Sequence, residues 1–283
     1  MKRLFIIFFS MILLVACQKD VVVDGGSAST LTYSLSTGVS FEVKGTVSDP
    51  AAVPGGASKI NVLWYGVYHK KTDANGQTYY DYIEEMGAYV TIDDPSNIPV
   101  PITLIKDQEY KLVFVAQHRF EAPQRTTTYA YTVAPDGIMS VNQSAPFTNG
   151  DQLEAFIKVD EVGPITGNET RSITLDRIVS QINIGTNATT APSAVDLTVS
   201  GAPISYDIFN NRYSPETSTL AFANFTTKGD NLTVSGTDYT RLSTLYVLGG
   251  NRIDLTISYN GNTKVVSNIA TAPNYKSNVV GEI

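Results

Sequence analysis

Apolar and polar residues alternate along the segment Leu31-Thr-Tyr-Ser-Leu-Ser-Thr-Gly-Val-Ser-Phe-Glu-Val43. A period of two places successive side chains on opposite faces of a β-strand, so this segment predicts strands with one buried face. Further segments share this pattern, or are rich in β-branched and aromatic residues, and lie between turn signals: Ile60–Trp64, Lys70–Tyr80, Met86–Ile92, Val100–Leu104, Tyr110–Gln117, Thr126–Val133, Ile173–Ile184, Val195–Val199, Leu220–Phe225, Tyr239–Leu248, Arg252–Tyr259 and Lys264–Asn268. Many short strands with turns every 8–12 residues or so predict an all-β fold of sandwich type.

Two Asn-Gly pairs predict tight hairpins, at Asn75-Gly76 and at Asn260-Gly261, because both residue types tolerate the positive φ of a type I′ turn. Gly163-Pro164 lies in Asp160–Thr170, where no regular element is expected. We therefore predict two β-sandwich domains, an N-terminal one over residues 31–165 and a C-terminal one over residues 166–283.

The N-terminus has the pattern of an export signal. Lys2 and Arg3 precede an apolar run that ends at Leu14-Val-Ala-Cys17, and Cys17 is the only cysteine of the chain. This arrangement resembles a bacterial lipobox, in which the signal (residues 1–16) is cut between Ala16 and Cys17 and the cysteine is acylated. A secretory signal with an incidental cysteine is the alternative. Residues 17–30 are rich in Gly, Ser and Asp and predict a tether, so acyl chains would hold the protein on a membrane.

Composition restricts the partners. Of the 20 basic residues two leave with the signal, so 18 basic residues face 27 acidic ones and the mature net charge is −9. An acidic surface repels phosphate backbones, so we expect no nucleic acid partner. With Cys17 acylated, the mature chain can form no intrachain disulfide, and core burial and sheet hydrogen bonds must hold the fold.

Residues suited to catalysis or metal binding are sparse. His69 and His118 are the only histidines and show no ligand spacing, so neither a metal nor another cofactor is expected. Acidic pairs occur at Glu84-Glu85, Asp93-Asp94 and Asp160-Glu161, and we interpret them as solvated loop charges, because neighbours in a strand point to opposite faces. Asp73-Ala-Asn-Gly76 lacks the spacing of a calcium loop and predicts a turn. A hydrolase is the weakest hypothesis, and we expect no enzyme.

Aromatic residues are abundant, with 16 Tyr, 11 Phe and one Trp. Rigid amphipathic rings suit recognition of sugars or proteins when they are exposed, and otherwise fill the inner faces of strands. The rings that could form a binding patch are Trp64, Tyr79, Tyr80, Tyr82, Tyr129 and Tyr131.

Four segments resemble motifs of the fimbrillin-like lipoproteins of Bacteroidetes, the pilin family of type V fimbriae. In chain order they are Tyr110-Lys-Leu-Val-Phe-Val-Ala-Gln117, Glu154-Ala-Phe156, Leu175-Asp-Arg-Ile-Val-Ser-Gln-Ile-Asn-Ile-Gly-Thr186 and Pro273-Asn-Tyr-Lys-Ser-Asn-Val-Val-Gly281. Together with the lipobox they extend from residue 1 to residue 281.

The resemblance implies two tandem transthyretin-like β-sandwich domains after a lipoprotein signal peptide, and a place in the outer membrane and the fimbrium. Its implied partners are other fimbrial subunits, joined by strand exchange after proteolytic removal of the first strand, with a host or bacterial surface as a further ligand. The groove left behind would accept an extended segment of a neighbouring subunit.

The chain departs from the family pattern at Val115, where tryptophan is common, at Ser180, where alanine is usual, and at Pro273, where a basic residue is usual. No arginine occurs between Arg3 and Arg119, so arginine-specific removal of the first strand is not available. Lys44 is the alternative maturation site; otherwise the lipid is retained.

The leading hypothesis is therefore a lipid-anchored, non-enzymatic fimbrial subunit or fimbria-associated adhesin at the cell surface. The alternative is a surface lipoprotein that binds glycans for a polysaccharide uptake system.

Overall fold

The computed structural model describes residues 27–37, 42–43, 60–120, 129–143, 147 and 150–282. Within these ranges the chain consists of β-strands and connecting turns, and its only helical elements are two short 3-10 turns, η2 (Glu84–Met86) and η3 (Gly150–Leu153). The all-β prediction is confirmed. In the part of the chain that the structure describes, no helix is long and apolar enough to span a bilayer.

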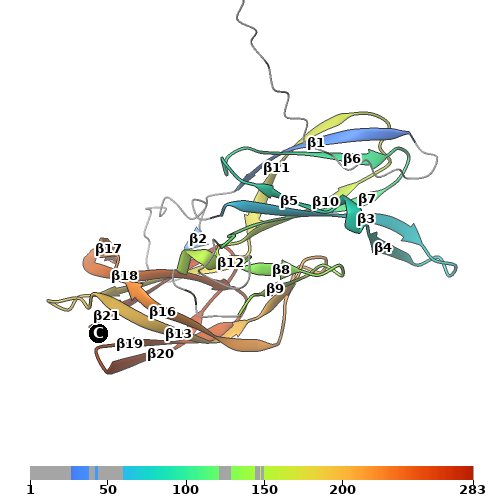
Figure 1. Cartoon of the computed structure of the whole chain (residues 1–283). Coiled ribbons are helices and arrows are strands. Elements are labelled where there is room, and N and C mark those ends of the chain that lie inside the picture. Colours follow the sequence, from blue (N-terminus) through green and yellow to red (C-terminus); the bar gives the residue numbers. More distant parts are fainter. Residues whose placement is uncertain are drawn as a thin grey trace, which may run out of the picture.

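The first sheet has eight strands: β1 (Ala28–Thr37), β3 (Val62–Thr72), β4 (Thr78–Tyr82), β5 (Ala88–Thr91), β6 (Ile98–Ile105), β7 (Tyr110–Gln117), β10 (Phe156–Val162) and β11 (Glu169–Arg177). Their order is β4-β3-β7-β10-β11-β1-β6, and β5 pairs with β3. Only two residue pairs join β10 to β11, at Phe156 and Ile157, so the sheet folds over there. It forms a sandwich in which β1, β6 and β11 lie over β3, β7 and β10 (Figure 1).

A hydrophobic core fills the space between these layers. Alternate residues of β1, β6 and β7 line it, as the period-two pattern predicts. In β6 the inward residues Ile98, Val100, Ile102 and Leu104 are buried, whereas the intervening residues are exposed.

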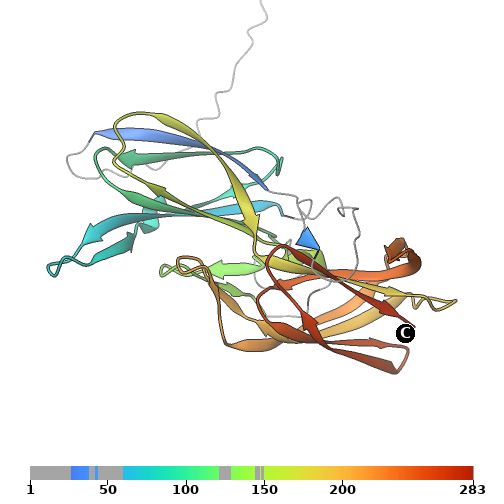
Figure 2. The ribbon, with the colours of Figure 1, turned by 180° about the vertical axis from the view of Figure 1, so that it is seen from behind.

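Nine strands form two further sheets. A five-stranded sheet has the order β17 (Asn231–Val234), β18 (Thr237–Leu248), β12 (Val179–Thr186), β21 (Tyr275–Gly281) and β2 (Glu42–Val43). A four-stranded sheet has the order β16 (Thr217–Thr226), β13 (Ala194–Pro203), β19 (Arg252–Tyr259) and β20 (Asn262–Ala270). These two sheets face each other as a second sandwich (Figure 2).

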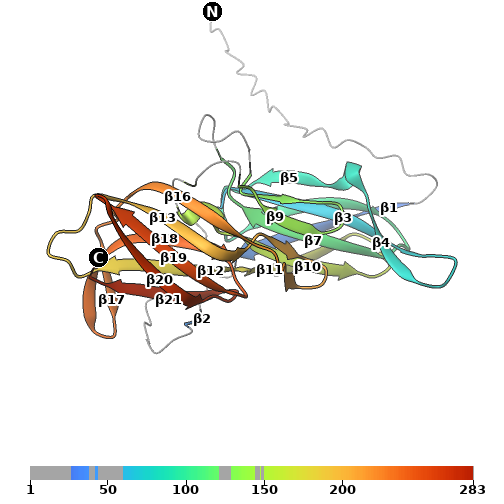
Figure 3. The ribbon, with the colours of Figure 1, turned by 90° about the horizontal axis from the view of Figure 1, so that it is seen from below.

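A small sheet joins residues from both halves of the sequence. Its order is β15 (Arg212–Tyr213), β14 (Ser205–Asp207), β9 (Ile138–Val141) and β8 (Tyr131–Val133). The second hydrophobic core includes Tyr131, Met139 and Tyr206 of this small sheet. It also contains Val113 and Val115 of β7 together with residues of β12, β13 and β18. β7 is therefore buried on both faces and contributes one face to each of the two hydrophobic cores, and the two sandwiches lie end to end in Figure 3.

The chain passes from the first sheet to the second almost without a loop, because Ile178 alone separates β11 from β12. The predicted division at residues 165/166 lies in the connection between β10 and β11, two strands of the first sheet.

The two Asn-Gly turns differ. Asn260 and Gly261 have φ of 47° and 79°, which confirms the type I′ hairpin between β19 and β20. At the tip of the β3–β4 hairpin only Gly76 has positive φ (81°), so the predicted type I′ turn is wrong. The Asp73 carboxylate accepts hydrogen bonds from the backbone N–H groups of Asn75 and Gln77, and this Asx-type contact fixes a longer loop.

Candidate functional site: the seat of the first strand

β1 lies between two neighbours that come from distant parts of the sequence. It pairs antiparallel with β6, from Ala28 opposite Ile105 to Leu35 opposite Ile98. It pairs in parallel with β11, from Leu31 opposite Glu169 to Thr37 opposite Leu175. We call the space that β1 fills between β6 and β11 the β1 seat. Because β6 is the edge strand, removal of β1 would separate it from the rest of the sheet.

Three side chains of β1 enter the core from one face of the strand. Leu31, Tyr33 and Leu35 are each 0% exposed, whereas the intervening Thr32 is exposed. Burial of a leucine side chain contributes about 1.5–3 kcal/mol, so Leu31 and Leu35 together bind β1 firmly. The Tyr33 ring lies 4.9 Å from the ring of Phe114 in β7, across the sandwich.

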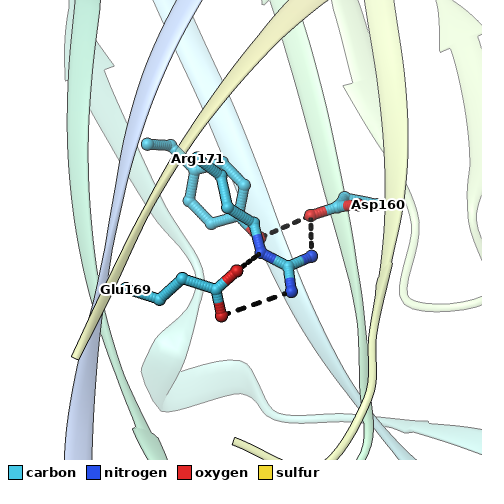
Figure 4. Close-up of polar contacts among 4 residues, drawn as sticks. Asp160, Glu169 and Arg171 are labelled. Carbon is cyan, nitrogen blue, oxygen red and sulfur yellow. Dashed lines mark hydrogen bonds and ion pairs between the residues drawn. The ribbon is translucent and has the colours of Figure 1, made fainter. Parts of the chain in front are cut away.

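The Tyr33 hydroxyl ends in a charged cluster. It donates a hydrogen bond of 2.7 Å to Oδ2 of Asp160 in β10. The Arg171 guanidinium lies between two carboxylates (Figure 4), with one nitrogen 2.9 Å from the same Asp160 oxygen and Nε 2.9 Å from Glu169. One positive and two negative groups give the cluster a formal charge of −1, and Tyr33 is its neutral donor.

The electrostatics keep the Tyr33 phenol protonated. Burial, followed by the hydrogen bond to Asp160, raises the pKa of Tyr33 well above its usual range. A phenolate would lose its donor proton and face a carboxylate, so the contact stays a donor–acceptor pair over the physiological pH range.

A second polar pair lies at the junction of the two sandwiches. Arg177, the last residue of β11, contacts Glu154 at 2.6 Å, and both side chains are 0% exposed. The guanidinium also lies 4.6 Å from the centre of the Phe156 ring. Glu154, Phe156 and Arg177 come from two of the family-like motifs, and the structure brings these motifs together.

Amides of the third and fourth motifs also meet. Asn183 of β12 donates to Asn278 of β21 at 2.9 Å and accepts from Gln181 and from the Thr244 hydroxyl of β18. This buried hydrogen-bond ladder ties the C-terminal strand to the middle of the five-stranded sheet. The motifs thus have a structural role, which explains their residue types without a ligand.

The proposed lipidation and cleavage residues, Ala16, Cys17 and Lys44, lie outside the described residues. His69 contacts Gln108 at 2.9 Å, and the His118 ring packs edge-on against Phe120. Within the described ranges no group of three His, Cys, Asp or Glu residues could hold a metal ion.

The acidic pairs fall into two classes. Glu84-Glu85 and Asp93-Asp94 are exposed, as predicted. The prediction is wrong for Asp160, which lies in β10 and binds Tyr33 and Arg171. The sequence signal that could have identified it is a carboxylate inside a strand that begins with Phe156-Ile157 and contains Val159.

The aromatic residues are largely structural. Trp64 is 6% exposed, and Tyr131 is fully buried, with its hydroxyl donating to the Leu153 carbonyl oxygen at 2.6 Å. Among the aromatic residues that the structure describes, Tyr79 and Tyr89 are the exposed ones, at 46% and 43%. Tyr89 stacks on Tyr129 with ring centres 4.1 Å apart and an interplanar angle of 1°.

No family model matches the sequence, and no curated protein matches it either. Among solved structures, this chain is similar to a Bacteroides thetaiotaomicron protein proposed to bind polysaccharide, with 12% identity, a TM-score of 0.48, and coverage of 89% of this chain and 90% of that chain.

It is also similar to a fimbrial assembly protein from Parabacteroides distasonis (12% identity, TM-score 0.38, covering 91% of this chain and 92% of that chain). A third is the fimbrial anchor protein Mfa2 from Porphyromonas gingivalis (13% identity, TM-score 0.41, covering 85% of this chain and 82% of that chain).

Proposed function

We propose that this chain is a lipid-anchored cell-surface fimbrial subunit or fimbria-associated adhesin, that it catalyses no reaction, and that it joins neighbouring subunits by β-strand donation. The observation that carries the proposal is the β1 seat. A strand near the N-terminus is bound on both edges and buries three side chains in the core. The lipobox-like segment ending at Cys17 supports export and anchoring in the outer membrane.

The proposal of strand donation rests on the groups that loss of β1 would expose. The inner edges of β6 and β11 would present unpaired backbone N–H and C=O groups, and three core pockets would open. An extended segment of another subunit can satisfy both needs, because its backbone completes the sheet and its alternate side chains fill the pockets. A vacant β1 seat would be unstable, because its backbone groups would lack partners and its three core pockets would be open.

Maturation by cleavage after Lys44 fits the chain order. Lys44 directly follows β2, which pairs with Tyr275 and Lys276 of β21. One cut would therefore free β1 from the first sheet and β2 from the second. Without that cut β1 would remain attached and the subunit would be an anchor.

Anchoring is tested by Cys17→Ser. The variant should leave the membrane fraction, because no acyl chain can be attached to serine through a thioether. A variant that stays with the membrane would contradict the lipid anchor.

Strand donation is tested by limited digestion with a lysine-specific protease. Digested mature protein should form ladders that resist mild detergent, and Lys44→Gln, given the same treatment, should remain monomeric. Monomers from both proteins would contradict assembly through the vacated seat.

The alternative function, glycan binding, rests on the stack of the exposed Tyr89 on the half-buried Tyr129, since a flat aromatic face can pack on a sugar ring. Burial of Trp64 removes the ring best suited to that role. Retardation in polysaccharide affinity gels that is lost in Tyr89→Ala would favour glycan capture, and equal mobility of both proteins would argue against it.

A further inference from the structure

The β1 seat contains three pockets of unequal chemistry. Those of Leu31 and Leu35 belong to the first apolar core, so aliphatic side chains of similar volume can replace one another there at modest cost. The middle pocket, which holds Tyr33, begins against the Phe114 ring and ends at Asp160. Its two ends therefore select for an aromatic body and a polar tip.

The polar end is fixed before any strand enters. Asp160 belongs to β10, and Arg171 and Glu169 belong to β11, so all three charged residues remain when β1 is absent. Asp160 and Arg171 are only partly solvated, with side-chain exposures of 22% and 26%. Arg171 divides its donors between two carboxylates, which leaves acceptor capacity on Asp160 for a further donor.

The consequence for an incoming strand depends on the side chain that it places there. A phenylalanine would fill the ring space but would shield the Asp160 carboxylate from water without giving it a hydrogen bond, which is the costly arrangement. A small side chain would leave a void beside Phe114. Tyrosine reaches Asp160 as a neutral donor while its ring covers Phe114, as Tyr33 does in β1.

We propose that Asp160 makes the β1 seat selective, so that the strand it accepts carries a tyrosine at the middle of three inward positions, in the pattern aliphatic-x-Tyr-x-aliphatic. The proposal rests on strand donation and specifies the chemistry of the donor. Its occupant is an extended segment of a neighbouring subunit, and β1 itself is the internal example of the pattern.

The test uses the mature full-length chain with a sequence-specific protease site inserted between Lys44 and Gly45. The protein is cleaved after folding, so that β1 is held without a covalent link. Exchange is then followed by the fluorescence anisotropy of a labelled peptide with the sequence of Ala28–Thr37, in competition with unlabelled peptides. Circular dichroism checks that each host protein remains folded.

The Tyr33→Phe peptide should compete roughly 10- to 100-fold more weakly than the unchanged peptide, because it loses a hydrogen bond to a charged group. The matched control is the Thr32→Ala peptide, which changes the neighbouring exposed position and should compete equally well. On an Asp160→Asn host, which keeps the shape of the side chain but removes its charge, the difference between Tyr and Phe should fall to roughly 5-fold or less.

The outcomes separate the two proposals. If the labelled peptide never enters the cleaved protein, strand donation fails and the selectivity fails with it. If the unchanged peptide and the Tyr33→Phe peptide compete equally on the unmodified host, strand donation stands and the selectivity is refuted. An equal Tyr-to-Phe ratio on both hosts would also refute the role of Asp160.

Discussion

Glu154→Gln should be among the most damaging single substitutions in this protein. It removes the negative charge from a pair whose two side chains are 0% exposed and leaves the Arg177 guanidinium buried without its counterion. Breaking a buried ion pair in this way costs about 3–5 kcal/mol. Contacts that remain, with Phe156 and with Asn274, place the expected loss toward the lower end of that range.

The measurement is urea unfolding of protein produced without residues 1–17, monitored by circular dichroism and tryptophan fluorescence. If the protein is unfolded by heat instead of urea, the same loss of stability corresponds, for a chain of this size, to a decrease in Tm of roughly 6–20 °C. The double variant Glu154→Leu/Arg177→Met removes both charges and keeps the volume, so it should be more stable than Glu154→Gln. A cost below about 1 kcal/mol for Glu154→Gln, or a double variant less stable than it, would refute the reasoning.

Three further predictions concern other sites. Gly150→Ala places a methyl group 2.1 Å from a backbone oxygen of β18 and should cost about 1–3 kcal/mol or more in urea unfolding, whereas Gly163→Ala, whose methyl group meets nothing within 4 Å, should be neutral. Burial raises the pKa of Tyr206 to about 12, so its phenol stays protonated in the folded protein while the unfolded chain ionises near pH 10. The stabilisation that comes from the protonated Tyr206 should thus be fully present below pH 10, and the free energy of unfolding should fall by about 1.4 kcal/mol per pH unit for each such group as the pH rises to 12. Titration at 295 nm should show tyrosines that ionise late. Ionisation of all tyrosines near pH 10 without unfolding would contradict this prediction. Asn183→Ala should cost about 1–3 kcal/mol, because it leaves the buried Thr244 of β18 and the half-buried Asn278 of β21 without their bond. An unchanged urea midpoint would show that water replaces the amide.

Local pattern predicted several strands well. Val100–Leu104, which alternates buried and exposed residues, lies within β6, and Tyr110–Gln117, which is buried on both faces, is a strand over its predicted length. The Asn260-Gly261 hairpin has the predicted turn type. Asn75-Gly76 has the same dipeptide and a different turn, because the Asp73 carboxylate two residues earlier binds the loop backbone. The Asn-Gly dipeptide alone therefore does not determine the turn type, because a side chain outside the dipeptide can bind the loop backbone.

The sequence predicted the buried strand of the candidate site but not the residues that bind it. Alternation in Leu31–Leu35 predicts a buried strand face, and the lipobox predicts that this strand lies near an anchor. The partner of Tyr33 could not be predicted, because Asp160 is 127 residues away and comes close only when the first sheet folds over itself. Glu154 and Arg177 were visible as motif residues, but their pairing depends on the same long-range closure.

The position of β1 has a mechanical consequence. If the chain is tethered at Cys17, tension from the membrane enters the fold at Ala28, the first residue of β1. A pull along the strand axis loads the hydrogen bonds to β6 and β11 together, in shear, because the two ladders run along the strand and overlap from Leu31 to Leu35. Bonds loaded in shear must break as a group, whereas a peeled strand yields one bond at a time. In a chain tethered at Cys17, β1 would thus be held in the geometry that best resists extraction by flow.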